Sequence, residues 1–233
     1  MQKKISIVFP ILTLISSVVF AQSDGTGIWS NIGVETKWKK FDLSAETEIR
    51  SENYFDHIKR LSLQLEAAYT IVKPIKIGAS YQLIDHYDEA FDDYQLRSRV
   101  SVFVQGKQKI GNFTFILQEK AQFTTKDDSD RLDSEGNIDT YKISPEWMWR
   151  NKLKVKYDIR NFPVTPSFSV ETFYQLNNPD GNQFDKLRYT LSLGYKLNKQ
   201  NQIECYGLIN NKINVSDAGK SYVLGIGYTY SFR

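Results

Sequence analysis

The sequence predicts an all-β chain that folds as an antiparallel transmembrane β-barrel of about 10 to 12 strands, with short periplasmic turns and longer extracellular loops. Three observations predict this fold: an export signal at the N-terminus, apolar and polar side chains that alternate over about ten residues at a time, and short connections that alternate with long ones. Taken alone, the mean hydropathy of -0.44 and the formal net charge of +3 would instead indicate an ordinary soluble domain.

The first 21 residues have the pattern of a secretory signal peptide. Lys3 and Lys4 precede an apolar run from Ile5 to Phe20, and Ala21 ends a small-residue cleavage site. We expect cleavage after Ala21, which leaves residues 22–233 as the barrel; the alternative is an uncleaved N-terminal anchor. Gln22 follows the cleavage site, so the signal is not that of a bacterial lipoprotein. A single cysteine, Cys205, excludes an internal disulfide, and its neighbours favour a packing role.

Alternation predicts the strands one by one. In FDLSAETEIR, residues 41–50, the odd positions are Phe, Leu, Ala, Thr and Ile, and the even positions are polar or charged. Successive side chains of a strand point to opposite faces, so one face is apolar and the other polar. The last strand, SYVLGIGYTYSF, has large apolar residues on one face and small ones on the other. The same reading predicts eleven strands in all, at residues 28–38, 41–50, 60–72, 75–85, 94–105, 110–123, 141–157, 164–176, 185–197, 202–210 and 221–232.

The connections indicate a membrane barrel rather than a soluble sandwich. A sandwich has no reason to gather its short turns at one end and its long loops at the other, whereas an outer-membrane barrel does. The predicted short turns are residues 39–40, 73–74, 106–109, 158–163 and 198–200, and the predicted loops are residues 51–59, 86–93, 124–140, 177–184 and 211–220.

Eleven strands conflict with the even number found in bacterial single-chain barrels. With the short turns in the periplasm, the strand at residues 28–38 would also begin on the outside. We therefore expect either a hidden twelfth strand, within residues 124–157, or a first strand that lies outside the closed wall.

Aromatic residues of the apolar faces fall near the strand ends, where two belts of amphipathic rings would meet the two membrane interfaces. The residues that we expect to face lipid in these belts are Trp38, Phe41, Tyr69, Trp147, Tyr157, Tyr195, Tyr228, Tyr230 and Phe232.

The strand patterns WSNIGVETKW, FDLSAETEIR, RNKLKVKYDI, KLRYTLSLGYKL and YVLGIGYTYSF resemble those of an uncharacterised outer-membrane barrel family of Bacteroidota, named only as a domain of unknown function. The resemblance covers the mature chain and implies a fold and a place, with no activity. The terminal strand also resembles the one that the barrel-assembly machinery recognises, although Arg233 follows the terminal Phe. The implied location is the outer membrane of a Gram-negative bacterium, and the implied partners are its lipid, lipopolysaccharide and the assembly machinery.

The polar faces carry charges that we expect to form a network in the lumen. The members are Glu46, Glu48, Glu66, Arg97, Arg99, Arg150, Glu171 and Arg188. In one interpretation Glu171 lies between Arg150 and Arg188 in an internal plug of ion pairs, since buried charges need partners. In the other, acidic early strands face basic later strands across a water-filled lumen that selects small polar or anionic solutes.

Glu119 shares the parity of Phe113, Phe115 and Phe123, and it would face lipid unless a bulge turned it inward.

From the two interpretations of the lumen charges, the expected function is a structural or interaction barrel, or a narrow channel for small polar solutes.

The alternative function is a lipid-modifying hydrolase with a rim-located active site, for which His57 and His86, near Ser51, Ser80 and Asp85, are the only candidates. No motif joins them, so we predict no catalytic residues. The acidic loop at residues 124–137 lacks EF-hand spacing, and no zinc, cofactor or nucleic-acid motif is present, so we predict no metal, cofactor or nucleic-acid partner. A bridge from this loop through divalent ions to lipopolysaccharide is the alternative to a solvated loop.

Overall fold

The computed structural model describes residues 26–52, 57–89, 91–127, 135–136, 138, 144–179, 181–215 and 218–232. The predicted signal peptide lies outside the described residues, and so does most of the acidic stretch of the loop at residues 124–137. Among the described residues, no helix is long and apolar enough to cross a membrane.

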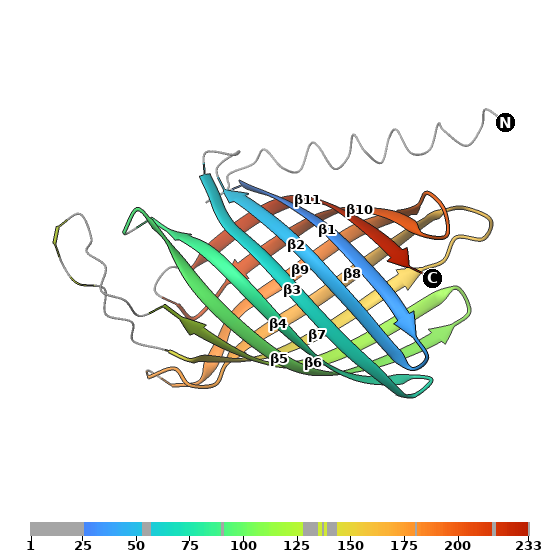
Figure 1. Cartoon of the computed structure of the whole chain (residues 1–233), viewed down its shortest axis with the longest axis horizontal. Helices are drawn as coiled ribbons and strands as arrows, with labels where there is room; N and C mark the ends of the chain where they lie inside the picture. Colours follow the sequence, from blue (N-terminus) through green and yellow to red (C-terminus); the bar gives the residue numbers. More distant parts are fainter. Residues whose placement is uncertain are drawn as a thin grey trace.

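Within the described ranges, eleven strands form one closed barrel, which confirms the predicted fold class (Figure 1). Each strand pairs with its sequence neighbours, so the wall follows chain order. The strands are β1 (Thr26–Trp38), β2 (Phe41–Glu52), β3 (His57–Val72), β4 (Ile75–Asp88), β5 (Asp93–Ile110), β6 (Phe113–Lys126), β7 (Glu146–Tyr157), β8 (Val164–Gln175), β9 (Gln183–Lys196), β10 (Asn201–Lys212) and β11 (Gly219–Phe232).

The barrel closes through a parallel pair, β1 with β11, so the expectation that the first strand lies outside the wall was wrong. The expectation of a twelfth wall strand within residues 124–157 was wrong as well, because β6 pairs directly with β7, although part of that range lies outside the described residues. The pairing runs from Thr26 opposite Tyr222 to Thr36 opposite Phe232, and β1 also pairs with β2 along its length. An odd number of strands that alternate in direction leaves the first and last strands pointing the same way, so only a parallel pair can join them. In Figure 1 the two strands lie side by side and point to the same end of the barrel.

The small face of β11 is what makes close packing at this junction possible. A Cβ atom added at Gly225 would lie 2.0 Å from the Tyr206 ring, and one added at Gly227 would lie 2.7 Å from the Asn31 side chain. Tyr206 comes from β10 and Asn31 from β1, the two neighbours of β11. Both side chains therefore cross over β11 on the lumen side, where any larger residue would displace them.

Cysteine pairs test the parallel closure directly. Ser30 lies opposite Ile226, so Ser30→Cys with Ile226→Cys, in a Cys205→Ser background, should form an intrachain disulfide. Neighbouring strands are about 4.8 Å apart, within the Cα separation that a disulfide spans. The readout is altered migration of the boiled, unreduced protein on a gel. Ser30→Cys with Tyr222→Cys is the out-of-register control, and cross-linking of both pairs or of neither would contradict this register.

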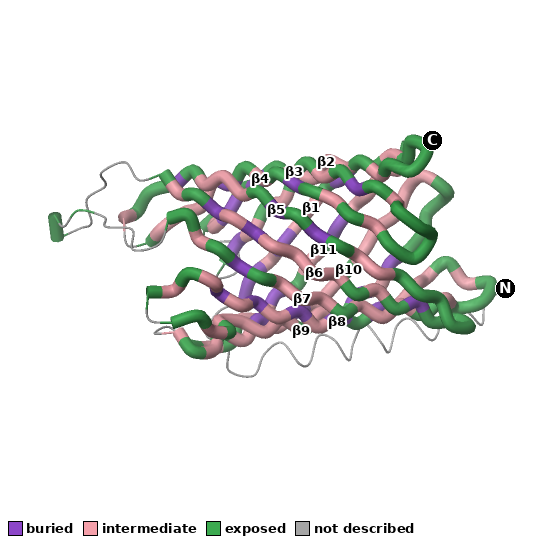
Figure 2. Tube along the Cα trace, turned by 90° about the horizontal axis from the view of Figure 1, so that it is seen from below, coloured by how far each residue is buried: buried purple, intermediate pink, exposed green. Residues whose placement is uncertain are grey.

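The barrel has two unlike ends, which we call the tight-turn end and the long-loop end. The tight-turn end carries the connections β1–β2, β3–β4, β5–β6, β7–β8 and β9–β10. Exposed positions gather at the ends and alternate with less exposed ones along the strands (Figure 2). Outward side chains are mostly large and apolar, and inward ones are polar, charged or small.

The two largest differences from the predicted strand boundaries are of five residues each. β5 continues to Ile110, and its turn falls at Gly111, whose φ of 59° suits glycine, instead of at residues 106–109. Lys107 and Lys109 therefore belong to the strand. β7 begins at Glu146 and not at residue 141, because Pro145 has no N–H to give to the ladder.

Candidate functional site

The most buried ion pairs of the barrel lie in the lumen and centre on Glu171 of β8. Its carboxylate accepts hydrogen bonds from Arg150 of β7, at 3.1 Å from Nε and 2.6 Å from Nη2, and its other oxygen lies 3.7 Å from Nη1 of Arg188 of β9. Arg150 also donates to Gln122 at 2.9 Å, and Arg188 donates to Asn210 at 2.7 Å. Since the Glu171 side chain is only 5% exposed, this carboxylate depends on protein partners instead of water.

Two aromatic rings extend this cluster across the lumen. Phe173 lies next to Glu171 on the inward face of β8, with the Arg150 guanidinium 4.6 Å and the Arg188 guanidinium 5.1 Å from its ring centre. Two guanidinium groups also lie over the Trp29 ring of β1: that of Arg188 is 5.3 Å and that of Arg50 of β2 is 3.6 Å from the ring centre. Cations over aromatic faces are attracted by the ring quadrupole, so the rings connect the charges of opposite walls.

Further hydrogen bonds continue around the remaining wall. Arg50 binds Glu48 through two nitrogens, at 2.8 and 3.1 Å. On the far side, Arg99 donates to Thr124 at 3.0 Å and to Gln82 at 3.4 Å. We call the whole set the central layer; it consists of Trp29, Glu48, Arg50, Arg99, Arg150, Glu171, Phe173 and Arg188.

Charge within the central layer is unbalanced. Its four arginines face two carboxylates, Glu48 and Glu171, and Lys152 and Lys186 of the neighbouring inward positions add more positive charge. Lys186 lies 4.2 Å from the Phe173 ring centre. The side chains of Arg50, Arg150 and Arg188 keep 16 to 20% of their exposure, so they are not wholly enclosed by protein. Such a layer favours small anions over cations.

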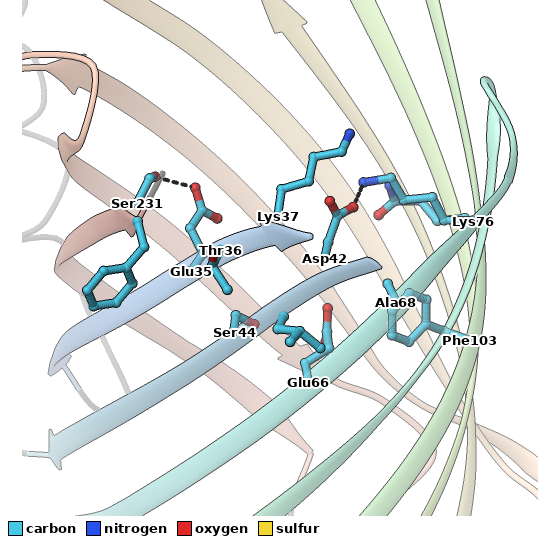
Figure 3. Close-up of a pocket in the computed structure, with 13 residues that line it drawn as sticks. Glu35, Thr36, Lys37, Asp42, Ser44, Glu66, Ala68, Lys76, Phe103 and Ser231 are labelled. Carbon is cyan, nitrogen blue, oxygen red and sulfur yellow. Dashed lines mark hydrogen bonds and ion pairs between the residues drawn. The ribbon is translucent and has the colours of Figure 1, made fainter. Parts of the chain in front are cut away.

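One pocket at the tight-turn end, which we call the acidic pocket, is lined mainly by β1 to β5. It has a volume of about 360 Å³ and contains Glu35, Asp42 and Glu66 together with Lys37 and Lys76. Figure 3 shows these side chains rising from the wall: Ser231 donates to Glu35 at 2.6 Å, and Lys76 pairs with Asp42.

A second pocket, which we call the basic pocket, is formed at the same end by strands of the other half of the wall, mainly β7 to β10. Its volume is about 330 Å³, and five lysines line it against two carboxylates. Lys154 lies 3.4 Å from Glu204, and Lys109 donates to Asp158 at 2.7 Å. That hydrogen bond lowers the pKa of Asp158, which lies in the β7–β8 turn, so this carboxylate stays ionised. The lysines are Lys107, Lys109, Lys154, Lys156 and Lys196.

The predicted lumen charges fall into separate groups in the structure. Glu48, Arg99, Arg150, Glu171 and Arg188 belong to the central layer. Glu46 accepts a hydrogen bond from Asn31 at 3.1 Å, Glu66 lines the acidic pocket, and Arg97 donates to Gln95 at 2.9 Å.

Sequence reasoning missed Trp29, Phe173 and the role of Arg50. The signal was present for Trp29, because Trp29 and Trp38 of the same strand have opposite parity, so only one of them can point outward.

The aromatic residues of the predicted belts all lie on the outward parity of their strands. Trp38 stacks on Phe41, which contacts Tyr69, at the tight-turn end. Trp147 packs edge-on against Phe123 toward the long-loop end, while Tyr157 contacts Phe113 at the tight-turn end. The remaining members, Tyr195, Tyr228, Tyr230 and Phe232, lie near the tight-turn end of β9 and β11.

Glu119 points outward, and no register shift turns it toward the lumen. Its carboxylate instead accepts a 2.8 Å hydrogen bond from the indole N–H of Trp149, which also donates to Asn151 at 2.9 Å. The indole therefore shields one carboxylate oxygen on an otherwise apolar outer surface.

The two histidines do not assemble with the serines near them. The His57 ring packs against the Tyr87 ring, with 5.4 Å between the ring centres, and the Ser51 hydroxyl donates to the carbonyl of Ile28. Ser80 is buried on the inward face of β4, whereas Asp85 is on the opposite parity. In the part of the chain that the structure describes, no hydrogen bond joins either histidine to Ser51, Ser80 or Asp85.

Two solved structures align with this chain. A structure described as "NanC porin structure in rhombohedral crystal form" aligns with a TM-score of 0.52 at 13% identity, over 87% of this chain and 96% of the other. A second, "Structure of porin refined at 1.8 angstroms resolution", aligns with a TM-score of 0.36 at 14% identity, over 82% and 58% of the two chains. The first of these shows a shared porin-like fold.

No curated protein matches the sequence. A family model described as "Protein of unknown function (DUF2490)" matches residues 26–221, which comprise nearly all of the barrel. The chain therefore belongs to the DUF2490 family.

Proposed function

We propose that this barrel is a narrow outer-membrane channel that passes small polar solutes and prefers anions. The observation that carries the proposal is the central layer, whose four arginines face two carboxylates around a lumen narrowed by Trp29 and Phe173. A fixed positive charge at the narrowest layer attracts anions and repels cations, and the effect is largest where little water screens it.

The outer surface supports a membrane location. Outward side chains form a largely apolar surface, with aromatic rings toward both ends, and the strands of 12 to 18 residues are long enough to cross a bilayer. The DUF2490 match fits the resemblance only in that both families are named for an unknown function. If the barrel is exported, its tight-turn end would face the periplasm. The closed wall of β1 to β11 leaves no free sheet edge.

The test is ion selectivity of protein purified from the outer-membrane fraction, with its barrel confirmed by a heat-modifiable shift on a gel. In planar bilayers under a potassium chloride gradient, the reversal potential should show a higher permeability for chloride than for potassium. Arg150→Gln should reduce this preference, whereas Arg160→Gln, in the exposed β7–β8 turn, is the matched control and should leave it unchanged. Cation preference, or no conductance from folded protein, would contradict the proposal.

A further inference from the structure

We propose that the basic pocket is a binding site for a compact, multiply charged oxyanion, a phosphoryl or polycarboxylate compound that enters or leaves the channel at the tight-turn end. This inference rests on the proposed function, and it specifies the class of solute. Five lysines from three strands, β5, β7 and β9, surround a volume of about 330 Å³, which is within the range of small-ligand pockets.

The lysines carry more positive charge than their protein partners neutralise. Glu204 pairs with Lys154 and also accepts a 2.5 Å hydrogen bond from Ser192, while Asp158 pairs with Lys109. Among the described residues, no carboxylate lies within ion-pairing distance of Lys107, Lys156 or Lys196. Like charges held this close repel one another, and a bound anion with two or more charges would remove that repulsion.

Uncharged donors complete the site. Thr114 and Thr165 present hydroxyl groups and Gln202 an amide between the lysines. Ammonium groups on flexible stems act as mobile point charges with three donors each, in contrast to the rigid fork of an arginine. The pocket is therefore suited to a class of oxyanions instead of one planar carboxylate.

The position of the pocket gives it a role in permeation. The acidic pocket is centred on β2 and β3, and the basic pocket on β7 and β8, so strand order places them on opposite walls of the same mouth. The field between them directs an anion to the basic wall, from which Lys154, Lys152 and Arg150 follow at successive inward positions of β7 up to the central layer. A multivalent anion bound at the mouth should therefore also obstruct the chloride current.

Calorimetry on the full-length barrel in detergent at low salt tests the site without any transport. Pyrophosphate and citrate are the probes, and gluconate, with one charge, is the comparison ligand. We expect at least one of the two multivalent probes to bind more tightly than gluconate. Lys156→Gln with Lys196→Gln should weaken that binding about ten-fold, which corresponds to roughly 1.4 kcal/mol.

The matched control is Lys73→Gln with Lys199→Gln, which removes two exposed lysines from turns at the same end, outside the pocket. Equal weakening by both double variants, or no preference for the multivalent probes, would overturn the site. Folding of each variant is checked by the heat-modifiable shift, and Lys156→Gln alone replaces the double variant if the latter does not fold. Binding without chloride conductance would support the site and contradict the channel, while conductance without binding would do the reverse.

Discussion

Glu171→Gln should destabilise the barrel by about 3 to 5 kcal/mol, because it removes the carboxylate that Arg150 and Arg188 share and leaves their charges facing each other in a poorly hydrated lumen. Lys152, directly opposite Glu171 in the β7–β8 ladder, adds a third positive charge to the unbalanced cluster. The change is nearly isosteric, so lost packing contributes little. The measurement is the unfolding temperature of the purified barrel in detergent, followed by the heat-modifiable shift.

A second variant separates charge imbalance from other damage. Glu171→Gln with Arg188→Gln should recover part of the loss, since the pair of changes returns the net charge of the central layer to that of the parent. Glu204→Gln is the control, because the Glu204 side chain is 35% exposed and its lysine lies at 3.4 Å, so water replaces much of what the carboxylate provides. Unfolding of the Glu171 variants at the temperature of the parent would show that the central layer is well hydrated and that the ion pairs do not stabilise the wall.

The wall of the barrel could be predicted from the sequence because strand alternation is a local property. In FDLSAETEIR the pattern repeats every two residues, and β2 forms where it predicts. The closure could not be predicted in this way. Pairing of β1 with β11 joins residues about 200 positions apart, and a parallel pair adds no signature to either strand. The small face of β11 could be recognised in the sequence. The reason for it could not, because that face makes room for Tyr206 and Asn31 of the two neighbouring strands.

The candidate site shows the same division between local and distant information. Parity placed Glu171, Arg150 and Arg188 on inward faces of consecutive strands, and near-equal distances from their turns brought them to one depth. Parity does not say which inward side chains meet across the lumen. Arg188 contacts the Trp29 ring of β1, on the wall beyond β10 and β11, because barrel curvature and strand tilt bring them together.

The second large effect should come from Trp29→Ala, which should both weaken the barrel and widen the lumen at the central layer. Trp29 is 8% exposed, packs with Leu208 and Val223, and holds the guanidinium of Arg50 at 3.6 Å from its ring centre. Truncating a buried Trp lowers the free energy of unfolding by about 3 to 5 kcal/mol. Here the change also removes the aromatic ring over which both Arg50 and Arg188 lie.

Removing the indole should therefore lower the unfolding temperature and increase the single-channel conductance, which is measured in planar bilayers together with the reversal potential. Trp38→Ala is the matched control, because this indole of the same strand is 61% exposed and points outward. It should leave the conductance at the parent value. If both variants conduct alike, the resistance of the channel lies elsewhere than at Trp29. If Trp29→Ala alone conducts better while its anion preference falls, the Trp29 indole and the arginines beside it form the narrowest and most selective layer of the barrel.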